Sequence, residues 1–522
     1  MSTLPVHAVE SVLESPPSPR RGGPLVVALG AALASAVLFR LGTGLDPAAW
    51  LTWLAPLPVL VAAPRVGAAA AGGAAFAAWL GGESGMWSYY RGEDQLDMPL
   101  PAVLAVFLGT ALVFAGVVLL VRRLLRLRRF ALAAVALPAA WAAVEYLASL
   151  VTPHGAFWSL AYSQADVLPV LQTASATGPW GVTFLVLAVP AAAATCLAPD
   201  VTNRVRITAS VAAAALLATA LGYGAWRLDA SAGSAERVRV ALVSTSRDRD
   251  PIPVDTPEGR DLLAGYLAEA RQAAERGARF VVLPENTFEA DDRTMPMLSG
   301  PFAALATERR VDVVVGVRLG SGATTYNTAW DFPAAGGAPS VYRKHHMVPG
   351  LEDDFTPGEG LAFVPGTGTR YGVIICKDLD FPDLVREFGR EGTRFLLAPA
   401  WDFDSDAWLH SRMAATRGVE NGLTVARSAR RGALTVSDPY GRVSAERRTG
   451  GSGQFTSLVA DAALPHNRTL YTRFGDWFAW LSTALLLAAL VGAVPGVRRS
   501  GSGRGRSAQG RSGQDRRRTS NV

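Results

Sequence analysis

Hydrophobic residues are arranged in two different ways along this chain. Long apolar stretches fill residues 24–226 and return at 476–497, whereas the region between them alternates short β-branched runs with mixed segments. A helix that crosses the hydrocarbon core of a bilayer needs about 20 mostly apolar residues. The pattern therefore predicts membrane-spanning helices on both sides of a folded domain. The expected spans are residues 24–41, 47–63, 66–82, 100–121, 130–150, 179–198, 206–226 and 476–496.

The second and third spans are short, and Pro56, Pro58 and Pro64 interrupt them, so the sequence defines their ends poorly. The first span is not expected to be a cleaved signal peptide, because six further spans follow it closely.

Arginine placement predicts how the chain crosses the membrane. Arginines precede the first span, form a cluster after the fourth, follow the sixth and fill the tail after the eighth. Cytoplasmic loops carry the excess of basic residues, and with eight spans all of these segments fall on one side. We therefore expect both termini in the cytoplasm and the folded domain on the external face. The arginines are Arg20, Arg21, Arg122, Arg123, Arg126, Arg128, Arg129, Arg204, Arg206 and the eight between Arg498 and Arg518.

This topology divides the chain into five expected segments. Residues 1–23 form a cytoplasmic N-terminal segment, 24–226 a transmembrane domain, 236–465 the external domain and 476–497 a closing span. Residues 498–522 form a basic tail rich in Arg, Gly and Ser, which is typical of disorder. A cytoplasmic anchor beside anionic lipid explains this tail more simply than nucleic-acid binding does. Much of the formal charge of +6 lies in the tail and indicates no acidic partner.

The external domain has the pattern of a layered α/β fold. Apolar strands are expected at 237–244, 279–283, 311–317, 371–376, 394–397 and 423–426, with helices at 259–276 and 407–420. Continuous apolar runs that alternate with helices predict sheets buried on both faces.

Lysine and cysteine are both rare. The chain has 50 basic side chains, yet Lys344 and Lys377 are its only lysines, and Cys196 and Cys376 are its only cysteines. Cys196 lies in an apolar span and is expected to be a buried, inert thiol. Cys376 is then the only thiol of the external domain, and an unpaired cysteine in an exported domain is a candidate reactive group.

Three potentially reactive residues follow predicted strands. Glu285 follows residues 279–283, Lys344 follows a short strand at 340–343, and Cys376 ends the run 371–376. Reactive groups of α/β domains gather beyond strand ends, where loops converge. A carboxylate that takes the thiol proton, an ammonium that stabilises an oxyanion and a thiolate that attacks a carbonyl suffice for acyl transfer.

Each of these residues also has a simpler interpretation. Cys376 could be a buried thiol at a strand end, Glu285 could cap a turn, and Lys344 could be a solvated surface residue. Lys377 could lower the thiol pKa, contact a lipid phosphate or point into solvent. His345 and His346 would point to opposite faces of a strand, so neither a metal nor a cofactor is expected.

Short motifs along the chain connect these residues to a known family. Leu283-Pro284-Glu285, Tyr342–Pro349 and Ile375–Asp378 resemble the three motifs of the nitrilase superfamily, which has a Glu–Lys–Cys triad on an αββα sandwich. Seven spans, an external domain of this type and one closing span resemble the layout of the apolipoprotein N-acyltransferase family. Similar segments of that family are found at 53–57, 155–164, 413–422 and 437–441, so the resemblance covers about residues 24–497.

The resemblance implies a role for each residue. Cys376 would be the nucleophile, Glu285 the general base and Lys344 the stabiliser of the transition state, with Glu352 as an accessory carboxylate. The enzyme would be a bacterial inner-membrane protein, surrounded by membrane lipids, that needs no cofactor. It would move a fatty acyl chain from a phospholipid to Cys376, and then to the N-terminal amine of a diacylglyceryl-cysteine lipoprotein.

Two positions beside the cysteine depart from the family pattern. Lys377 replaces a residue that is usually aromatic, and Asp378 replaces a usual glutamate, as in many soluble amidases. The family's Asn-Asp-Ala-Trp-Phe stretch lacks its asparagine in residues 398–403. A membrane-tethered amidase or nitrilase-type hydrolase, an N-acyltransferase with another amine acceptor and a catalytically silent scaffold therefore remain alternatives.

Overall fold

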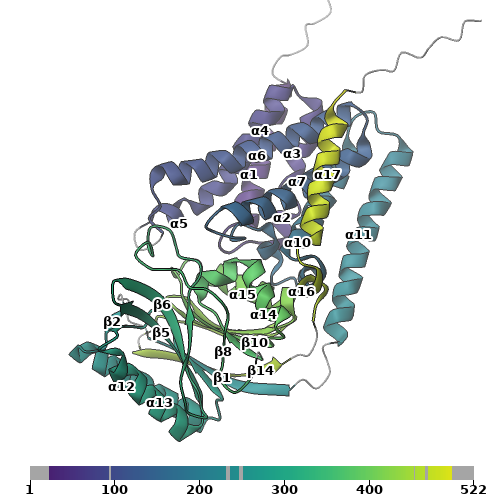
Figure 1. The fold of residues 1–522 in the computed structure, drawn as a ribbon. Helices are drawn as coiled ribbons and strands as arrows, with labels where there is room; N and C mark the ends of the chain where they lie inside the picture. Colours follow the sequence, from purple (N-terminus) through teal and green to yellow (C-terminus); the bar gives the residue numbers. More distant parts are fainter. Residues whose placement is uncertain are drawn as a thin grey trace, which may run out of the picture.

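A computed structural model describes residues 23–92, 96–230, 236–245, 251–368, 370–451, 453–464 and 468–495. A helical bundle is stacked on an α/β domain (Figure 1). The expected N-terminal segment, except for Gly23, and the basic tail lie outside the described residues.

Seven apolar helices build most of the bundle. Five of them are long and apolar enough to cross a membrane, and the last helix, α17, is a shorter apolar one. The first and last of these helices have their outer ends at the same end of the bundle, away from the α/β domain (Figure 1). The helices are α1 (Gly23–Gly42), α4 (Ala68–Glu83), α6 (Leu100–Arg126), α7 (Phe130–Val151), α10 (Pro179–Leu197), α11 (Asn203–Ala230) and α17 (Trp477–Ala493).

The second expected span is not one continuous helix. It divides into α2 (Ala49–Thr52), α3 (Leu57–Ala62) and the 3₁₀ turn η1 (Ala63–Arg65), with the first break just before Pro56. Proline lacks the N–H that an inner helical turn requires, which explains the interruption. Cys196 near the end of α10 is half-buried, so the expectation of a fully buried thiol is wrong.

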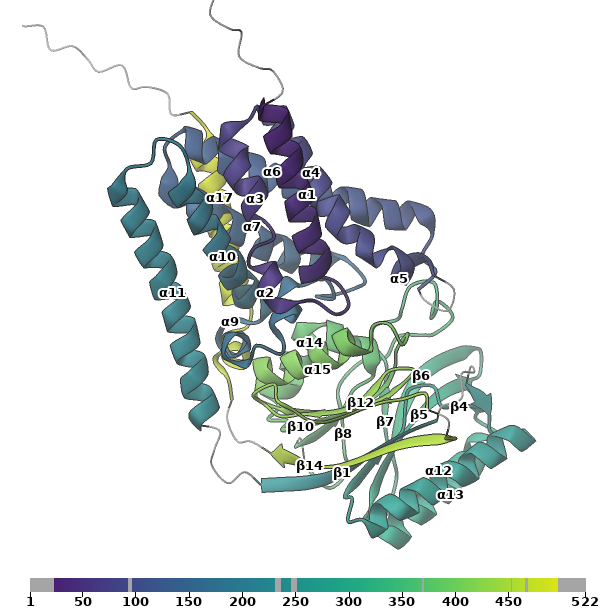
Figure 2. The same ribbon diagram turned by 180° about the vertical axis from the view of Figure 1, so that it is seen from behind.

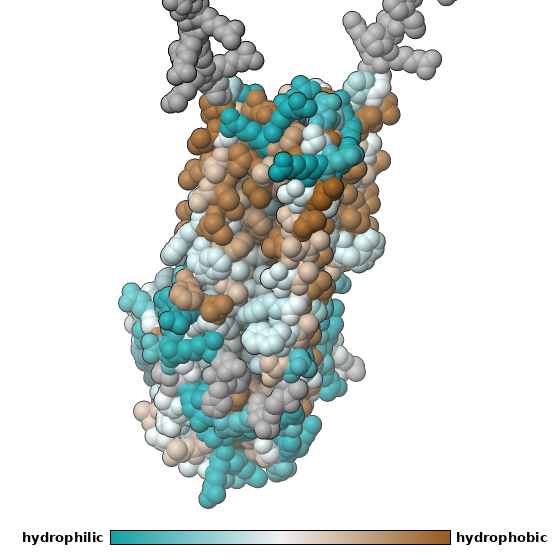
Figure 3. Space-filling view, turned by 90° about the vertical axis from the view of Figure 1, so that its right-hand side faces the viewer, coloured by the Kyte–Doolittle hydropathy of each residue, from teal (hydrophilic) through white to brown (hydrophobic). Residues whose placement is uncertain are grey.

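Apolar side chains cover the outside of the bundle. On the face shown in Figure 3, brown residues cover most of the bundle, whereas teal residues are concentrated on the α/β domain and at the far end of the bundle. Helix α11 lies along the side of the bundle, as both ribbon views show (Figure 2), and exposes Ile207, Val211 and Trp226. An exposed apolar surface of this extent is typical of contact with membrane lipid.

Two sheets form the centre of the α/β domain. The first follows the order β14-β1-β3-β5-β4-β2, with β6 and β7 added antiparallel beyond β5, and the second follows β13-β12-β11-β10-β9-β8. The strands of the first sheet are β1 (Glu236–Thr245), β2 (Ile252–Pro253), β3 (Phe280–Val282), β4 (Phe288–Asp291), β5 (Asp312–Ser321), β6 (Thr324–Phe332), β7 (Ser340–Arg343) and β14 (Phe455–Leu464). Those of the second are β8 (Ala362–Phe363), β9 (Tyr371–Val373), β10 (Phe395–Trp401), β11 (Thr424–Arg430), β12 (Ala433–Ser437) and β13 (Val443–Arg448).

Helices cover the outer face of each sheet, which completes an αββα sandwich. Helices α12 (Pro257–Glu275) and α13 (Met295–Arg309) lie on the first sheet, far from the bundle (Figure 2). Helices α14 (Pro382–Arg390) and α15 (Ala407–Asn421) lie between the second sheet and the bundle (Figure 2). The short helix α16 (Leu470–Phe474) leads into α17.

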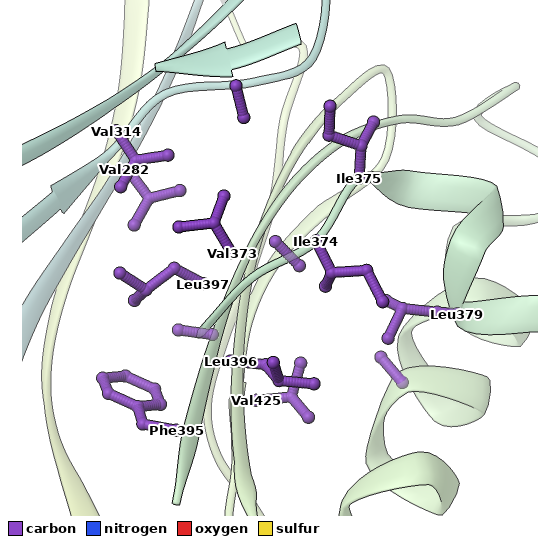
Figure 4. Packing of buried hydrophobic residues seen from close by; sticks show 14 of the residues in the cluster. Val282, Val314, Val373, Ile374, Ile375, Leu379, Phe395, Leu396, Leu397 and Val425 are labelled. Atoms are coloured by element: carbon purple, nitrogen blue, oxygen red, sulfur yellow. The ribbon is translucent and has the colours of Figure 1, made fainter. Parts of the chain in front are cut away.

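The continuous apolar strands are buried on both faces, as their sequence predicts. In β1, Val240 and Leu242 belong to the core between the sheets, whereas Ala241 and Val243 belong to the core under α12 and α13. The inter-sheet core is visible where Val282 and Val314 approach the second sheet (Figure 4). Alternate side chains of a strand point to opposite faces, so each face needs its own apolar set.

One expected strand ends early. The run 371–376 is a strand only as far as Val373. Cys376 instead begins the 3₁₀ turn η4 (Cys376–Asp380), and its φ is +41°. A positive φ is uncommon for a residue with a side chain, and such residues gather at functional sites.

Candidate active site

Glu285 lies in the loop after β3, where the two sheets meet. Its backbone N–H donates to the Ala400 carbonyl of β10 at 3.3 Å, and the residue is 2% exposed. Gly316 of β5 permits this path, because a Cβ there would lie 2.1 Å from the Pro284 carbonyl oxygen and 2.7 Å from Glu285 Cα. A side chain at position 316 would therefore displace the loop that carries the carboxylate.

Lys344 is the first residue after β7, and two carboxylates hold its ammonium. Nζ donates to Glu285 Oε1 and to Glu352 Oε2, each at 2.7 Å. Asn327 of β6 ties the same carboxylates together, because its Nδ2 donates to Glu285 Oε1 at 2.7 Å and to Glu352 Oε1 at 2.8 Å. The structure therefore brings Glu285, Lys344 and Glu352 into one buried network.

Burial and charge set the protonation of this network. Burial raises the pKa of Glu285, and the Glu352 charge raises it further, although the Lys344 charge opposes both. Burial alone would lower the pKa of Lys344, but the charges of Glu285 and Glu352 hold it well above its ordinary value. A cation is thus kept in a site from which water is largely excluded, where its field acts strongly.

Cys376 lies beside this network, on the turn that follows β9. The residue is 9% exposed, and its Sγ lies 3.5 Å from the Trp401 carbonyl oxygen, a weak contact. Burial and the Glu285 charge raise the pKa of the thiol, whereas the Lys344 charge lowers it. The thiol is therefore protonated at rest, and the charges of both Glu285 and Lys344 act on it.

Asp378 connects the cysteine turn to the lysine loop. Its buried carboxylate accepts hydrogen bonds from Tyr342 Oη at 2.8 Å and from the backbone N–H groups of His345 and His346 at 3.2 and 2.9 Å. His346 Nδ1 also lies 2.9 Å from Asp378 Oδ1. The expectation that the two histidines lie on a strand is wrong, because they follow β7 in a bend that this carboxylate fixes.

Lys377 points into the protein, so the solvated interpretation of this residue is wrong. The residue is 7% exposed, and its Nζ lies 3.4 Å from His154 Nδ1 and 3.6 Å from Asp380 Oδ2. His154 belongs to the loop after α7, and Ala156 of the same loop donates its N–H to the Asp380 carbonyl at 2.8 Å. The loop from the bundle therefore packs directly on the cysteine turn.

The thiol opens into a small pocket that adjoins a larger apolar cavity. The thiol pocket has a volume of about 50 Å³, and the cavity inside the bundle has a volume of about 330 Å³. Phe157 and Trp158 line both, so the two spaces share a wall. The thiol pocket is also lined by Tyr89, Tyr90, Leu96, Met98, His154, Val348, Cys376, Lys377, Asp380, Trp401, Phe403 and His410.

Asp402, Asp406 and His410 offer metal-ligating atoms that lie within 4.8 Å of one another. Both Asp402 oxygens are already bound by the Arg427 guanidinium, with Nη1 at 2.7 Å from Oδ2. Although burial opposes it, the charge of Asp406 and the ion-pair contacts of His410 Nδ1, at 3.3 Å from Asp402 Oδ1 and 3.2 Å from Asp406 Oδ2, raise the pKa of His410 to about 10. Because Arg427 already binds both Asp402 oxygens, the described contacts of this set form an internal ion network.

The sequence did not predict that Asn327 and His154 contact the residues of this site. Asn327 lies inside the antiparallel strand β6, without a motif of its own. His154 comes from the bundle, 223 positions before Lys377. Only His154 had a weak indication in the sequence, because it directly precedes residues 155–164, one of the segments that resemble the family.

Two family models match this chain. The N-terminal domain of apolipoprotein N-acyltransferase matches residues 34–192, and carbon-nitrogen hydrolase matches residues 239–467. The chain belongs to the apolipoprotein N-acyltransferase family. The second match covers the αββα sandwich and identifies it as a nitrilase-like domain, while the first covers apolar helices of a membrane domain.

Relatives of this family align over most of the chain. The apolipoprotein N-acyltransferase of Geobacter metallireducens is 27% identical over 68% of this chain and 74% of its own length. That of Bradyrhizobium diazoefficiens is 29% identical over 75% of this chain and 78% of its own length. Among solved structures, an amidase from Nesterenkonia sp. AN1 with acrylamide added at its active-site cysteine is 21% identical. The match covers 46% of this chain and 97% of the amidase chain, with a TM-score of 0.38.

Proposed function

We propose that this protein is a membrane-bound N-acyltransferase. It takes a fatty acyl chain from a phospholipid as a thioester on Cys376 and passes it to the N-terminal amine of a diacylglyceryl-cysteine lipoprotein. The observation that carries this proposal is the buried network of Glu285, Lys344 and Glu352 beside a thiol whose pocket shares a wall with an apolar cavity. Such a cavity suits an acyl chain and does not suit a small polar amide.

In the first half-reaction, Glu285 removes the proton of the Cys376 thiol, and the thiolate attacks an ester carbonyl of the phospholipid. The raised pKa of Glu285 makes its carboxylate a stronger base than an ordinary glutamate. Lys344 faces the oxyanion of the tetrahedral intermediate. The carbon–oxygen bond to glycerol then breaks, the glycerol oxygen takes the proton from Glu285, and a lysophospholipid leaves.

In the second half-reaction, the amine of the lipoprotein attacks the thioester carbonyl. Glu285 accepts the proton that the amine loses, the carbon–sulfur bond breaks, and Cys376 regains its proton. A thioester retains most of the reactivity of the acyl group, so the transfer needs neither ATP nor a cofactor. Glu352 and Asp378 act as positioning residues, one on the ammonium of Lys344 and the other on its loop.

We also propose the topology that places this chemistry outside the cytoplasm. Eight spans, of which the second is broken at Pro56, leave both termini in the cytoplasm of a bacterium and residues 236–465 on the external face of its inner membrane. The transmembrane domain then comprises residues 24–226 and the closing span 476–497. The arginine distribution and the common position of the outer ends of α1 and α17 support this arrangement (Figure 1).

The proposal is tested by incubating the purified protein with a phospholipid that carries a labelled acyl chain. We expect intact mass to show one acyl chain on Cys376, and a diacylglyceryl-cysteine peptide to discharge it as an amide. Cys376→Ala should form no adduct. An adduct that only water discharges would identify a hydrolase. No adduct with any lipid, and a Cys376→Ala variant that behaves as the wild type does, would refute both enzymatic functions.

A further inference from the structure

The ammonium of Lys377 is buried without a short hydrogen bond. Its nearest described partners are His154 Nδ1 at 3.4 Å and Asp380 Oδ2 at 3.6 Å. Strong hydrogen bonds between an ammonium and a carboxylate are about 2.7–2.9 Å long. The residue nevertheless lines the same pocket as Cys376 and is only 7% exposed. A cation held this loosely in a pocket retains the capacity to bind an anion that enters it.

The groups around Lys377 leave its charge only partly balanced. Burial and the nearby Lys377 charge lower the pKa of His154 to about 4, so its imidazole is neutral at physiological pH. Because an ammonium can only donate, His154 Nδ1 must accept, which assigns the ring proton to Nε2. Burial raises the pKa of Asp380, although the Lys377 charge opposes this. Asp380 is therefore a weaker counter-ion than an exposed aspartate.

We propose that Lys377, with the Nε2–H of His154, binds the phosphodiester of the acyl donor while Cys376 attacks the ester of the same molecule. This inference rests on the proposed function. A compact ammonium binds phosphate as a point charge, and the phosphodiester of a glycerophospholipid lies only a few bonds from its acyl ester. Adjacent residues can therefore address both groups at once. The site takes a phosphate-bearing lipid as its donor and disfavours a neutral one.

The test compares two donors with the same acyl chains, one with and one without a phosphodiester head group. Wild type and Lys377→Met are given a phospholipid or the diacylglycerol with the same acyl chains, in detergent micelles, and acylation of Cys376 is followed by intact mass. Loss of one charge-assisted hydrogen bond predicts that kcat/KM for the phospholipid falls by about 10- to 100-fold. The diacylglycerol rate should change far less, so the preference for phosphate disappears. Lys377→Arg should restore part of it, and Arg343→Met, which removes an exposed cation from the end of β7, should leave it intact.

The possible results distinguish phosphodiester binding by Lys377 from other roles of this residue. An equal fall with both donors would mean that Lys377 acts on the thiol or on folding, and no fall with either donor would also overturn the inference. Glycerol 3-phosphate should inhibit the wild type more strongly than Lys377→Met. Inhibition of that kind without a change in donor preference would mean that the site binds free phosphate instead of the lipid. A wild type that forms no thioester with either donor would instead contradict the proposed function.

Discussion

The variant Glu352→Gln tests whether Glu352, the second carboxylate bound to Lys344, supports catalysis and raises the pKa of the general base Glu285. Glu352 is 7% exposed and accepts three hydrogen bonds, from Lys344 Nζ at 2.7 Å, Asn327 Nδ2 at 2.8 Å and Val348 N at 2.7 Å. A glutamine in this place has one oxygen and one NH₂ group. Whichever way the amide turns, its NH₂ faces at least one of these donors. Asn327 cannot turn to compensate, because its Nδ2 also serves Glu285.

The expected loss is therefore one buried, charge-assisted hydrogen bond. Such a bond contributes about 1.5–3 kcal/mol, which corresponds to a fall of about 10- to 100-fold in the rate of acylation of Cys376. The pH dependence should move in a definite direction. Burial and the Glu352 charge raise the pKa of Glu285, and the base works only when ionised, so acylation declines as the pH falls through that raised value. Removal of the Glu352 charge lowers this pKa. The acid limb of the pH–rate profile, where the acylation rate declines, therefore moves to lower pH.

The assay measures the initial rate of thioester formation by intact mass across the acid range. Glu359→Gln is the matched control, because it removes an exposed carboxylate from the same loop. The reasoning predicts a slower enzyme with a more acidic limb, and a general loss of structure would give only the first effect. A limb that stays in place or moves to higher pH would refute the assignment of Glu285 as the base under the influence of Glu352.

Three further predictions concern the surroundings of the site. The raised pKa of His410, about 10 against 6.5 when unfolded, stabilises the fold fully below pH 6.5 and ever less as the pH rises through 10. The thermal midpoint of the wild type should fall across that range, and that of His410→Gln should show no such step. Arg417→Met leaves buried Glu420 without its 2.7 Å partner, so a cost of about 3–5 kcal/mol should appear as a lower midpoint. Asp378→Asn should slow acylation by about 10-fold, seen as slower thioester formation, because it loses charge-assisted contacts to the lysine loop.

The parts of the site that follow from local sequence could be predicted. Glu285 and Lys344 each follow a predicted strand and Cys376 ends one, and strand ends in one sandwich converge on the same edge. The broken second span follows from Pro56, because a missing N–H acts on its own helix whatever packs around it. The burial of both sheet faces follows from strands such as β1, which carry apolar residues on both sides, whereas the αββα order of the layers was implied only by the resemblance to the nitrilase superfamily.

The contacts that depend on distant segments could not be predicted. Asn327 joins Glu285 to Glu352 only because β6 pairs with β5 and β7, and an asparagine inside a strand has no local signal for that role. His154 reaches Lys377 through the docking of a bundle loop on the cysteine turn. The left-handed backbone of Cys376 likewise ends β9 early, although the apolar sequence favours a longer strand.

The two lysines of this arginine-rich chain illustrate why the compact ammonium is needed. Lys344 has three N–H donors, and its described carboxylate partners, Glu285 and Glu352, take two of them. The third is left for an oxyanion, whereas an arginine would present five donors in a rigid plane between the same two carboxylates. At Lys377, both described contacts are long, so the ammonium can turn toward an anion without breaking a strong bond. One lysine thus suits charge that develops on the acyl group, and the other suits charge that the donor already carries.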